Sequence, residues 1–406
     1  MRVSKRFAAA CAAILLTASA AQTTGAQKGT FGIAIGGGPY LSGSRIPLQL
    51  TGVPGRSSFA VSGPGSVTGS VFEAPYVTQS TQTGIIGAAQ GALAYRDVRI
   101  EPAPQAGRAL IAVASYDNGV TLHDPQTFAI LGYLAIGGPP GDVAFTARGD
   151  ILAPDTDGNI LAWATRSPWH VKYIEGVALG NEVAADERTG NAFVSNRDVN
   201  GAGALTRVTP AGTVTRVVTG ITAEGLAVDP ERSVVYVGNV NDRTVAAIDA
   251  STMNVRHKVP SVLRTFGIAL DAKKQILYTV ANISSDMHSG NGFVEAIDVR
   301  TGKAIARSGP MVFPLGAALD AQRDRLFVTD ESSDEVYVLD ARTLRTVHAP
   351  LLTCHTPWRP RIFHERLYVP CTRSDNVDVV DTRTLRRVAR APFATGGFPL
   401  SVAVWP

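Results

Sequence analysis

The sequence has few residues of the types that most often perform catalysis or hold metals. Its 406 residues include only three cysteines and seven scattered histidines. It contains no GxSxG nucleophile elbow, no P-loop, no GxGxxG opening a helix and no HExxH zinc motif. No motif in the chain therefore names a reaction.

Long apolar runs are also missing. The run Phe7–Leu16 is far below the ~20 residues that a membrane span needs, and no later stretch approaches that length. It follows a basic start, Met1–Arg6, and leads into small residues ending near Ala26. This order is typical of a secretory signal, so we expect residues 1–26 to be a signal peptide. The protein is then exported, periplasmic or extracellular, with no transmembrane segment.

A strong excess of one charge is absent once the leader is removed. The chain has 38 Lys and Arg against 34 Asp and Glu, and three of the basic residues lie in the leader. The exported chain thus has 35 basic and 34 acidic residues, a net charge near +1. This balance argues against a nucleic-acid partner.

Two cysteines, Cys354 and Cys371, remain after the leader. They flank an expected hairpin, Arg361–Val369, which brings them within a few residues of each other. An oxidising compartment favours a disulfide between them. A Cys–His metal site that uses His355 or His364 is the alternative, although the sequence has no CxxC or HxxxH spacing.

What the chain does have is a repeat. From about Arg108 onward, an apolar strand, a turn, an "LYV"-like strand, a polar loop and a "V-x-x-x-D" strand recur. The turn aspartates that end each unit most clearly are 49, 42 and 41 residues apart: Asp249, Asp298, Asp340 and Asp381. A repeat of about 40–45 residues with four short strands predicts an all-β chain folded as a β-propeller.

The repeats resemble the YVTN family of β-propeller repeats. The best copy is Tyr236-Val237-Gly238-Asn239 followed by Val245-Ala246-Ala247-Ile248-Asp249. The resemblance implies the fold and says little about activity, because propellers host many functions. We count seven blades in residues 108–406, and the strand Pro399–Val404 should complete the blade begun by Arg108–Ile136. Such closure removes a free sheet edge.

Residues 30–102 lack the repeat and are rich in Gly, Ser, Thr and Pro. The stretch Phe59–Val67, followed by Phe72–Pro75, resembles a bacterial Ig-like domain, which implies a small β-sandwich. An irregular extension packed on the propeller is the alternative. The expected strands are Ile46–Leu50, Ser58–Val61, Val67–Phe72, Ile85–Ala89 and Leu93–Ile100. Residues 103–107, with alternating prolines before them, read as a linker.

The loops between the second and third strands of each unit vary, whereas the aspartate turns are uniform. Function usually lies in loops carried by a rigid scaffold, so we expect partner binding on the face bearing the variable loops. The candidate residues are Asp198, Asn200, Asp286, His288 and Arg359. We predict an exported, monomeric, non-enzymatic binding or scaffold protein without a cofactor. Its partner is an unknown protein, glycan or small ligand.

A metal-dependent hydrolase is the alternative. Acids begin the inner strands of three blades (Asp142, Glu182 and Glu224), and Arg359 and Arg361 lie across the channel. Oxygens that converge on the axis suit Ca²⁺, and lactonases similar to the regucalcin/gluconolactonase family use such a set. The proposed ligands are Glu224, Asn196, Asn239 and Asp155. The competing interpretation is that the Asn and Asp side chains cap their own loops.

Overall fold

The computed structural model describes residues 31–35, 38–52, 55–117, 119–197, 201–261, 264–282 and 291–406. Regular secondary structure within these ranges consists of β-strands alone. They contain no helix long and apolar enough to cross a membrane. The all-β prediction is confirmed.

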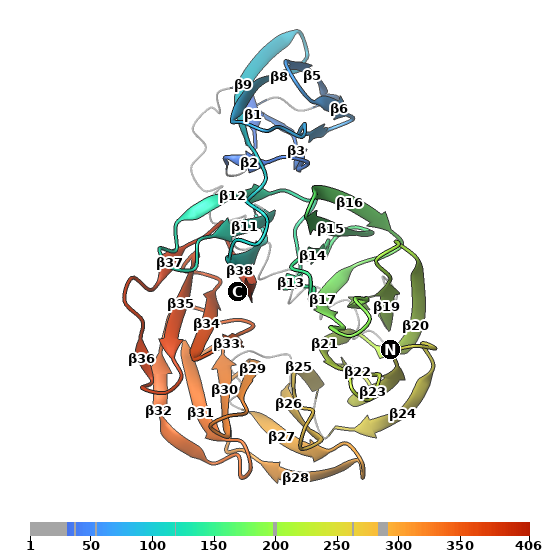
Figure 1. Ribbon diagram of the computed structural model, residues 1–406, viewed down its shortest axis with the longest axis vertical. Coiled ribbons are helices and arrows are strands. Elements are labelled where there is room, and N and C mark those ends of the chain that lie inside the picture. Colours follow the sequence, from blue (N-terminus) through green and yellow to red (C-terminus); the bar gives the residue numbers. More distant parts are fainter. Residues whose placement is uncertain are drawn as a thin grey trace.

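Antiparallel sheets stand side by side in a ring, each running from the axis outward (Figure 1). The first three after the opening blade are β13 (Ala144–Phe145), β14 (Ile151–Pro154), β15 (Ile160–Arg166), β16 (Trp169–Glu175); β17 (Gly180–Ala185), β18 (Ala192–Arg197), β19 (Ala202–Val208), β20 (Val214–Ile221); and β21 (Ala223–Asp229), β22 (Val234–Asn239), β23 (Thr244–Asp249), β24 (Val255–Pro260).

The next three sheets continue the ring: β25 (Arg264–Asp271), β26 (Ile276–Asn282), β27 (Gly292–Asp298), β28 (Lys303–Arg307); β29 (Pro314–Asp320), β30 (Arg325–Asp330), β31 (Glu335–Asp340), β32 (Thr346–Leu352); and β33 (Arg361–Phe363), β34 (Arg366–Cys371), β35 (Asn376–Asp381), β36 (Arg386–Arg387), with β37 (Phe393–Ala394) also on β35. Apolar residues of neighbouring sheets interlock between them. Leu122 and Ile151, both fully buried, belong to one such core.

The opening blade is completed by the C-terminal strand. β10 (Leu110–Ser115), β11 (Gly119–His123) and β12 (Ile130–Leu134) follow one another, and β38 (Pro399–Trp405) pairs with the inner edge of β10. Val402 lies opposite Val113, and both are fully buried. The predicted closing strand is therefore confirmed.

The aspartates that recur at the end of the repeats stabilise the turns in which they lie. The Asp340 carboxylate accepts hydrogen bonds from the backbone N–H groups of Arg342 and Thr343, at 3.0 and 2.8 Å. Asp249 and Asp381 act in the same way. These aspartates satisfy backbone donors that the turn would otherwise leave unpaired.

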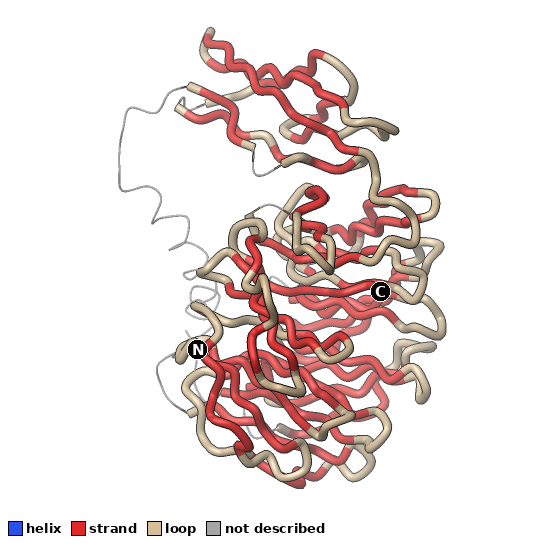
Figure 2. Tube along the Cα trace, turned by 60° about the vertical axis from the view of Figure 1, so that its left-hand side comes forward, coloured by secondary structure: helices blue, strands red, loops and turns tan. Residues whose placement is uncertain are grey.

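The N-terminal residues form a module beside the ring (Figures 1 and 2). Its strands are β1 (Gly32–Ala34), β2 (Tyr40–Leu41), β3 (Arg45–Pro47), β4 (Gln49–Thr51), β5 (Ser58–Ser62), β6 (Ser66–Thr68), β7 (Val71–Glu73), β8 (Thr81–Ala89) and β9 (Ala92–Glu101). Two expected single strands are wrong: Ile46–Leu50 is divided between β3 and β4, and Val67–Phe72 is divided between β6 and β7. Gly69, with φ of +61°, turns the chain so that β6 and β7 form a hairpin.

The module and the opening blade share one sheet. Its order is β38-β10-β11-β12-β2-β9-β8-β5, because β2 lies between β12 and β9. Tyr40 of β2 pairs with Tyr133 of β12 on one side and with Ile100 of β9 on the other. The link between module and ring is therefore a continuous hydrogen-bonded sheet in addition to the peptide connection at 102–109.

Buried polar contacts reinforce this junction. The fully buried Ser44 hydroxyl accepts from Ala135 N–H at 3.3 Å and donates to the carbonyl of Tyr133 at 3.2 Å. Trp169 and Tyr173, both in β16, donate to the carbonyls of Ser42 and Gly43, at 2.9 and 2.8 Å. These bonds fix the module against the first two blades.

Candidate functional site

Neighbouring inner strands of the second and third blades approach each other very closely near the ring axis. A Cβ atom added to Gly141 would lie 2.6 Å from the carbonyl oxygen of Gly180 and 2.7 Å from that of Asn181. Only glycine permits this approach. Polar side chains from the same level gather in what we call the axial cluster: Asp142, Asn181, Glu182, Arg197, Glu224, Arg359 and Arg361.

Arg359 is the centre of the axial cluster. It precedes β33, and its Nε lies 3.0 Å from Oε1 of Glu182 in β17. Its other nitrogens donate to the carbonyl oxygen of Gly141 at 2.8 Å and to Oδ1 of Asn181 at 2.8 Å. The Arg359 side chain is only 11% exposed. This candidate binding residue is thus occupied by contacts within the ring.

Glu224 is engaged on both carboxylate oxygens. Its Oε1 is paired with the guanidinium of Arg197, and its Oε2 accepts from the amide of Asn181. Arg359 Nη2 lies 3.7 Å from the same Oε2. Two guanidinium groups therefore surround this buried acid.

The remaining acids are held by backbone as well as by arginine. Asp142, fully buried, lies 3.3 Å from Arg361 and accepts from Val183 N–H at 3.0 Å. Burial raises the pKa of Glu182, and the Arg359 and Arg361 guanidinium groups oppose that rise. Three acids face three arginines here, so the axial cluster is balanced in charge. It holds sheets from different parts of the ring together.

The proposed calcium ligands do not fit a metal shell. Glu224 is paired with arginines, which would repel a cation. Asn196 bonds Thr206 and the carbonyl of Ala178, and Asn239 bonds Thr219 and Thr244. Asp155 accepts from Asp157 and Gly158 N–H, both at 3.0 Å.

These contacts match loop capping rather than ligation. Within the described ranges there is no group of three or more His, Cys, Asp or Glu suited to a metal ion. We therefore derive no chemistry from calcium at this axis.

The other candidates have mixed outcomes. Asp198, Asn200, Asp286 and His288 lie outside the described residues. Cys354 and Cys371 are joined by a disulfide with a Cα–Cα distance of 5.6 Å. His355, considered above for a metal site, instead contacts Asp334, with Nδ1 2.8 Å from Oδ2.

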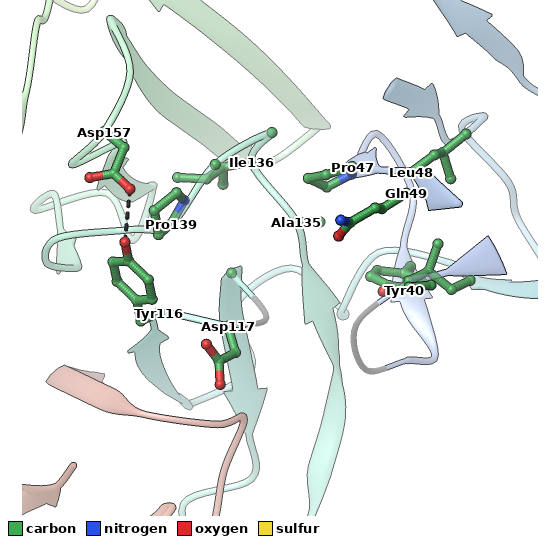
Figure 3. A pocket seen from close by; sticks show the side chains of 15 residues that line it. Tyr40, Pro47, Leu48, Gln49, Tyr116, Asp117, Ala135, Ile136, Pro139 and Asp157 are labelled. Atoms are coloured by element: carbon green, nitrogen blue, oxygen red, sulfur yellow. Dashed lines mark hydrogen bonds between the residues drawn. The ribbon is translucent and has the colours of Figure 1, made fainter. Parts of the chain in front are cut away.

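A cavity of about 770 Å³ lies between the module and the loops of the first two blades (Figure 3). Tyr116, Asp117 and Asp157 lie on the ring side. Pro139 lies beside Tyr116 and Asp157 on the ring side. Tyr40, Pro47, Leu48 and Gln49 lie on the module side, with Ala135 between. Sequence reasoning missed this site, because no motif shows that β2 pairs with β12.

The cavity lies on the predicted binding face. Tyr116 and Asp117 follow β10, and Asp157 follows β14, so they belong to the loops between the second and third strands of their blades. Tyr116 donates to Oδ2 of Asp157 at 2.8 Å, and burial together with Asp157 raises the pKa of the Tyr116 phenol. The volume falls within the range of about 300–1,000 Å³ usual for small-molecule sites, which occur preferentially at domain interfaces.

Comparison with known proteins supports the propeller and leaves activity open. No family model matches the chain. It is 27% identical over 135 residues to the uncharacterized protein YncE of Escherichia coli O157:H7, covering 31% of this chain and 36% of YncE. The match to YncE of Salmonella typhi is 27% over 146 residues and covers 39% of that protein. The aligned part thus spans little more than a third of these curated relatives.

Solved structures show the fold alone. Hydrazine synthase of Kuenenia stuttgartiensis superposes with a TM-score of 0.59 at 16% identity, over 70% of this chain and 93% of that one. A putative 6-phosphogluconolactonase of Bacteroides uniformis gives 0.59 at 12%, over 73% and 99%. These proteins carry different activities on similar propellers, so fold similarity does not choose among functions.

Proposed function

We propose that this chain is an exported, monomeric binding protein: an Ig-like module and a seven-bladed propeller that hold a small ligand between them. The single observation that carries the proposal is the cavity on the loop face, which lies between a module and a ring that one shared sheet joins. A site with walls held in place in advance loses less free energy on ordering when a ligand binds. A cavity of this volume suits a small ligand better than it suits a folded protein.

The axial cluster supports binding over hydrolysis. A catalytic acid or metal ligand must have an oxygen available to substrate or ion. The carboxylates of Glu182 and Glu224 instead accept from Leu226 N–H, Arg359, Arg197 and Asn181. The lactonase alternative is left with fold similarity to putative 6-phosphogluconolactonases, and the axial cluster serves to hold the ring together.

Thermal unfolding with a library of small molecules of all charge classes tests the proposal. A ligand that binds only the folded state stabilises it by RT ln(1 + [L]/Kd), about 2.7 kcal/mol at 100 times Kd. We expect at least one compound to raise Tm of the wild type but not of Gln49→Trp, which fills the cavity from the exposed side of β4.

Gln82→Trp is the matched control, because Gln82 is an exposed residue of β8 that does not line the cavity. It should respond like the wild type. A compound set that stabilises all three proteins equally, or none of them, would show that the cavity is not the binding site. Mass spectrometry of the exported protein tests the export step, with cleavage expected near Ala26.

A further inference from the structure

The cavity between module and ring has charge of one sign. Its lining includes the carboxylates of Asp117 and Asp157, both on exposed side chains, and no Lys, Arg or His among the described lining residues. Oδ2 of Asp157 accepts the hydrogen bond of the Tyr116 hydroxyl. A ligand in this space therefore meets negative charge on the ring side.

The carboxylate of Asp117 has fewer stabilising contacts than that of Asp157, which accepts the Tyr116 hydrogen bond. Its backbone N–H donates to the carbonyl of Gly397, but no cationic side chain of the described part of the chain pairs with its carboxylate. Burial and the nearby Asp375 raise the pKa of Asp117. Both effects disfavour the ionised form, so a positive group placed here would relieve an unfavourable arrangement.

Basic residues near the cavity are used elsewhere. Arg45 is next to Gly137, but its guanidinium lies 3.7 Å from Glu73 and 4.9 Å from the centre of the Tyr173 ring. These contacts belong to the junction between module and ring. Arg96 of β9 is also near, since burial raises the pKa of Tyr40 and the charge of Arg96 opposes that rise. Neither arginine forms an ion pair with Asp117 or Asp157 in the described part of the chain.

The opposite wall is apolar. Ile35 and Pro47 line the module side of this space, whereas the side chains of Leu48 and Ile136 pack into the hydrophobic cores behind it. A hydrated metal ion would gain little from these groups, whereas an organic cation would place its apolar body against them. A ligand that contacts both sides of the cavity therefore has a positively charged end and an apolar end.

We propose that the cavity binds a small organic cation, an ammonium or guanidinium group on an apolar body, with the charge at the ring-side acids Asp117 and Asp157 and the body against Ile35 and Pro47. This inference rests on the proposed function and names the ligand class for the same site.

Three probes of one shape test it: benzylammonium, benzyl alcohol and benzoate. Titration by NMR or calorimetry should show benzylammonium binding to the wild type, weaker binding of benzyl alcohol and none of benzoate. Asp117→Asn/Asp157→Asn should weaken benzylammonium binding roughly tenfold or more, because the negative charge that attracts the ammonium group is lost. The asparagine oxygen at 157 can still accept from Tyr116, which preserves the local structure.

Glu187→Gln/Glu231→Gln is the control, since it removes two exposed acids from turns on the opposite face of the ring. It should bind benzylammonium like the wild type. Equal affinity for the three probes, an unaffected Asp117/Asp157 double variant, or no benzylammonium binding would overturn the inference. If benzylammonium does not bind but an anionic or neutral compound from the library does bind in the cavity, the proposed function stands and only the ligand class is wrong.

Discussion

The Nε atom of Arg359 lies 3.0 Å from Oε1 of Glu182, although the two residues belong to sheets that are far apart in the chain. Arg359 also bonds the backbone of Gly141 and the side chain of Asn181. One guanidinium thus joins three blades across the axis. Because both partners are buried, removal of either leaves the other charged group without compensation.

Arg359→Met should destabilise the fold strongly. Breaking a buried ion pair from one side typically costs about 3–5 kcal/mol. Chemical denaturation measures this loss. Arg300→Met is the control: Arg300 pairs with Asp298 but is 66% exposed, so its loss should destabilise the protein far less, because solvent screens an exposed ion pair. Equal effects of the two substitutions would show that the axial cluster does not hold the ring together.

Deletion of residues 398–406 should give an insoluble or grossly destabilised protein. The deletion removes β38, exposes the inner edge of β10 and uncovers the partners of Val402. A fully buried valine alone is worth about 1.5–3 kcal/mol, against a total stability of about 5–15 kcal/mol. Deletion of Pro406 alone, which is exposed, is the control. A truncated protein that stays soluble and melts cooperatively would contradict the closure.

Added Ca²⁺ should leave the melting temperature unchanged. The arginines beside Glu224 and the hydrogen bonds of Asn196 and Asn239 oppose a metal shell at the axis. Elemental analysis of the purified protein and thermal unfolding in millimolar Ca²⁺, with Mg²⁺ as the control, check this. Stoichiometric calcium, or a rise in Tm with Ca²⁺ but not Mg²⁺, would restore the lactonase alternative.

The free energy of unfolding should fall as pH rises from about 4.5 to about 7, because the buried Glu331 carboxyl ionises over this range. Glu331 is 4% exposed, its Oε1 has no hydrogen-bond partner among the described residues, and burial raises its pKa to about 7. The folded state therefore holds this proton more tightly than the unfolded state, and the stability it contributes is lost as the carboxyl ionises. The contribution is on the order of 3 kcal/mol.

Denaturation of wild type and Glu331→Gln at pH 5 and pH 8 isolates this contribution. The variant should gain stability relative to the wild type at pH 8 and little at pH 5. Exposed Glu187→Gln is the control and should show no such difference. A pH-independent difference between Glu331→Gln and the wild type would contradict the assignment. His123, whose pKa burial lowers to about 4, acts in the opposite direction and is present in all three proteins.

Local signals were sufficient to predict most of the fold. The spacing of Asp249, Asp340 and the other turn aspartates predicted the strands because each carboxylate bonds backbone groups two and three residues later. The match of Pro399–Val404 to earlier inner strands predicted the closure. Both signals depend on short segments that carry the same information wherever they lie in the chain.

The site was harder to predict because it depends on contacts between distant residues. The sequence indicated that acids and arginines meet at the axis, but not that Arg359 and Glu182 neutralise each other. The cavity depends on β2, a two-residue strand whose pairing through Tyr40 no periodicity reveals. Asp198, Asn200, Asp286 and His288 stay predictions, since they lie outside the described residues.

The shared sheet also implies an order in which the parts of the first blade form during folding. The inner edge of β10 is covered only by β38, so it stays open while the ribosome makes the intervening chain, for on the order of tens of seconds. On its other side, the same blade already has β2 and the module in place. The first blade to be synthesised is therefore the last to be finished, and during that interval the module can begin the sheet that only the final residues complete.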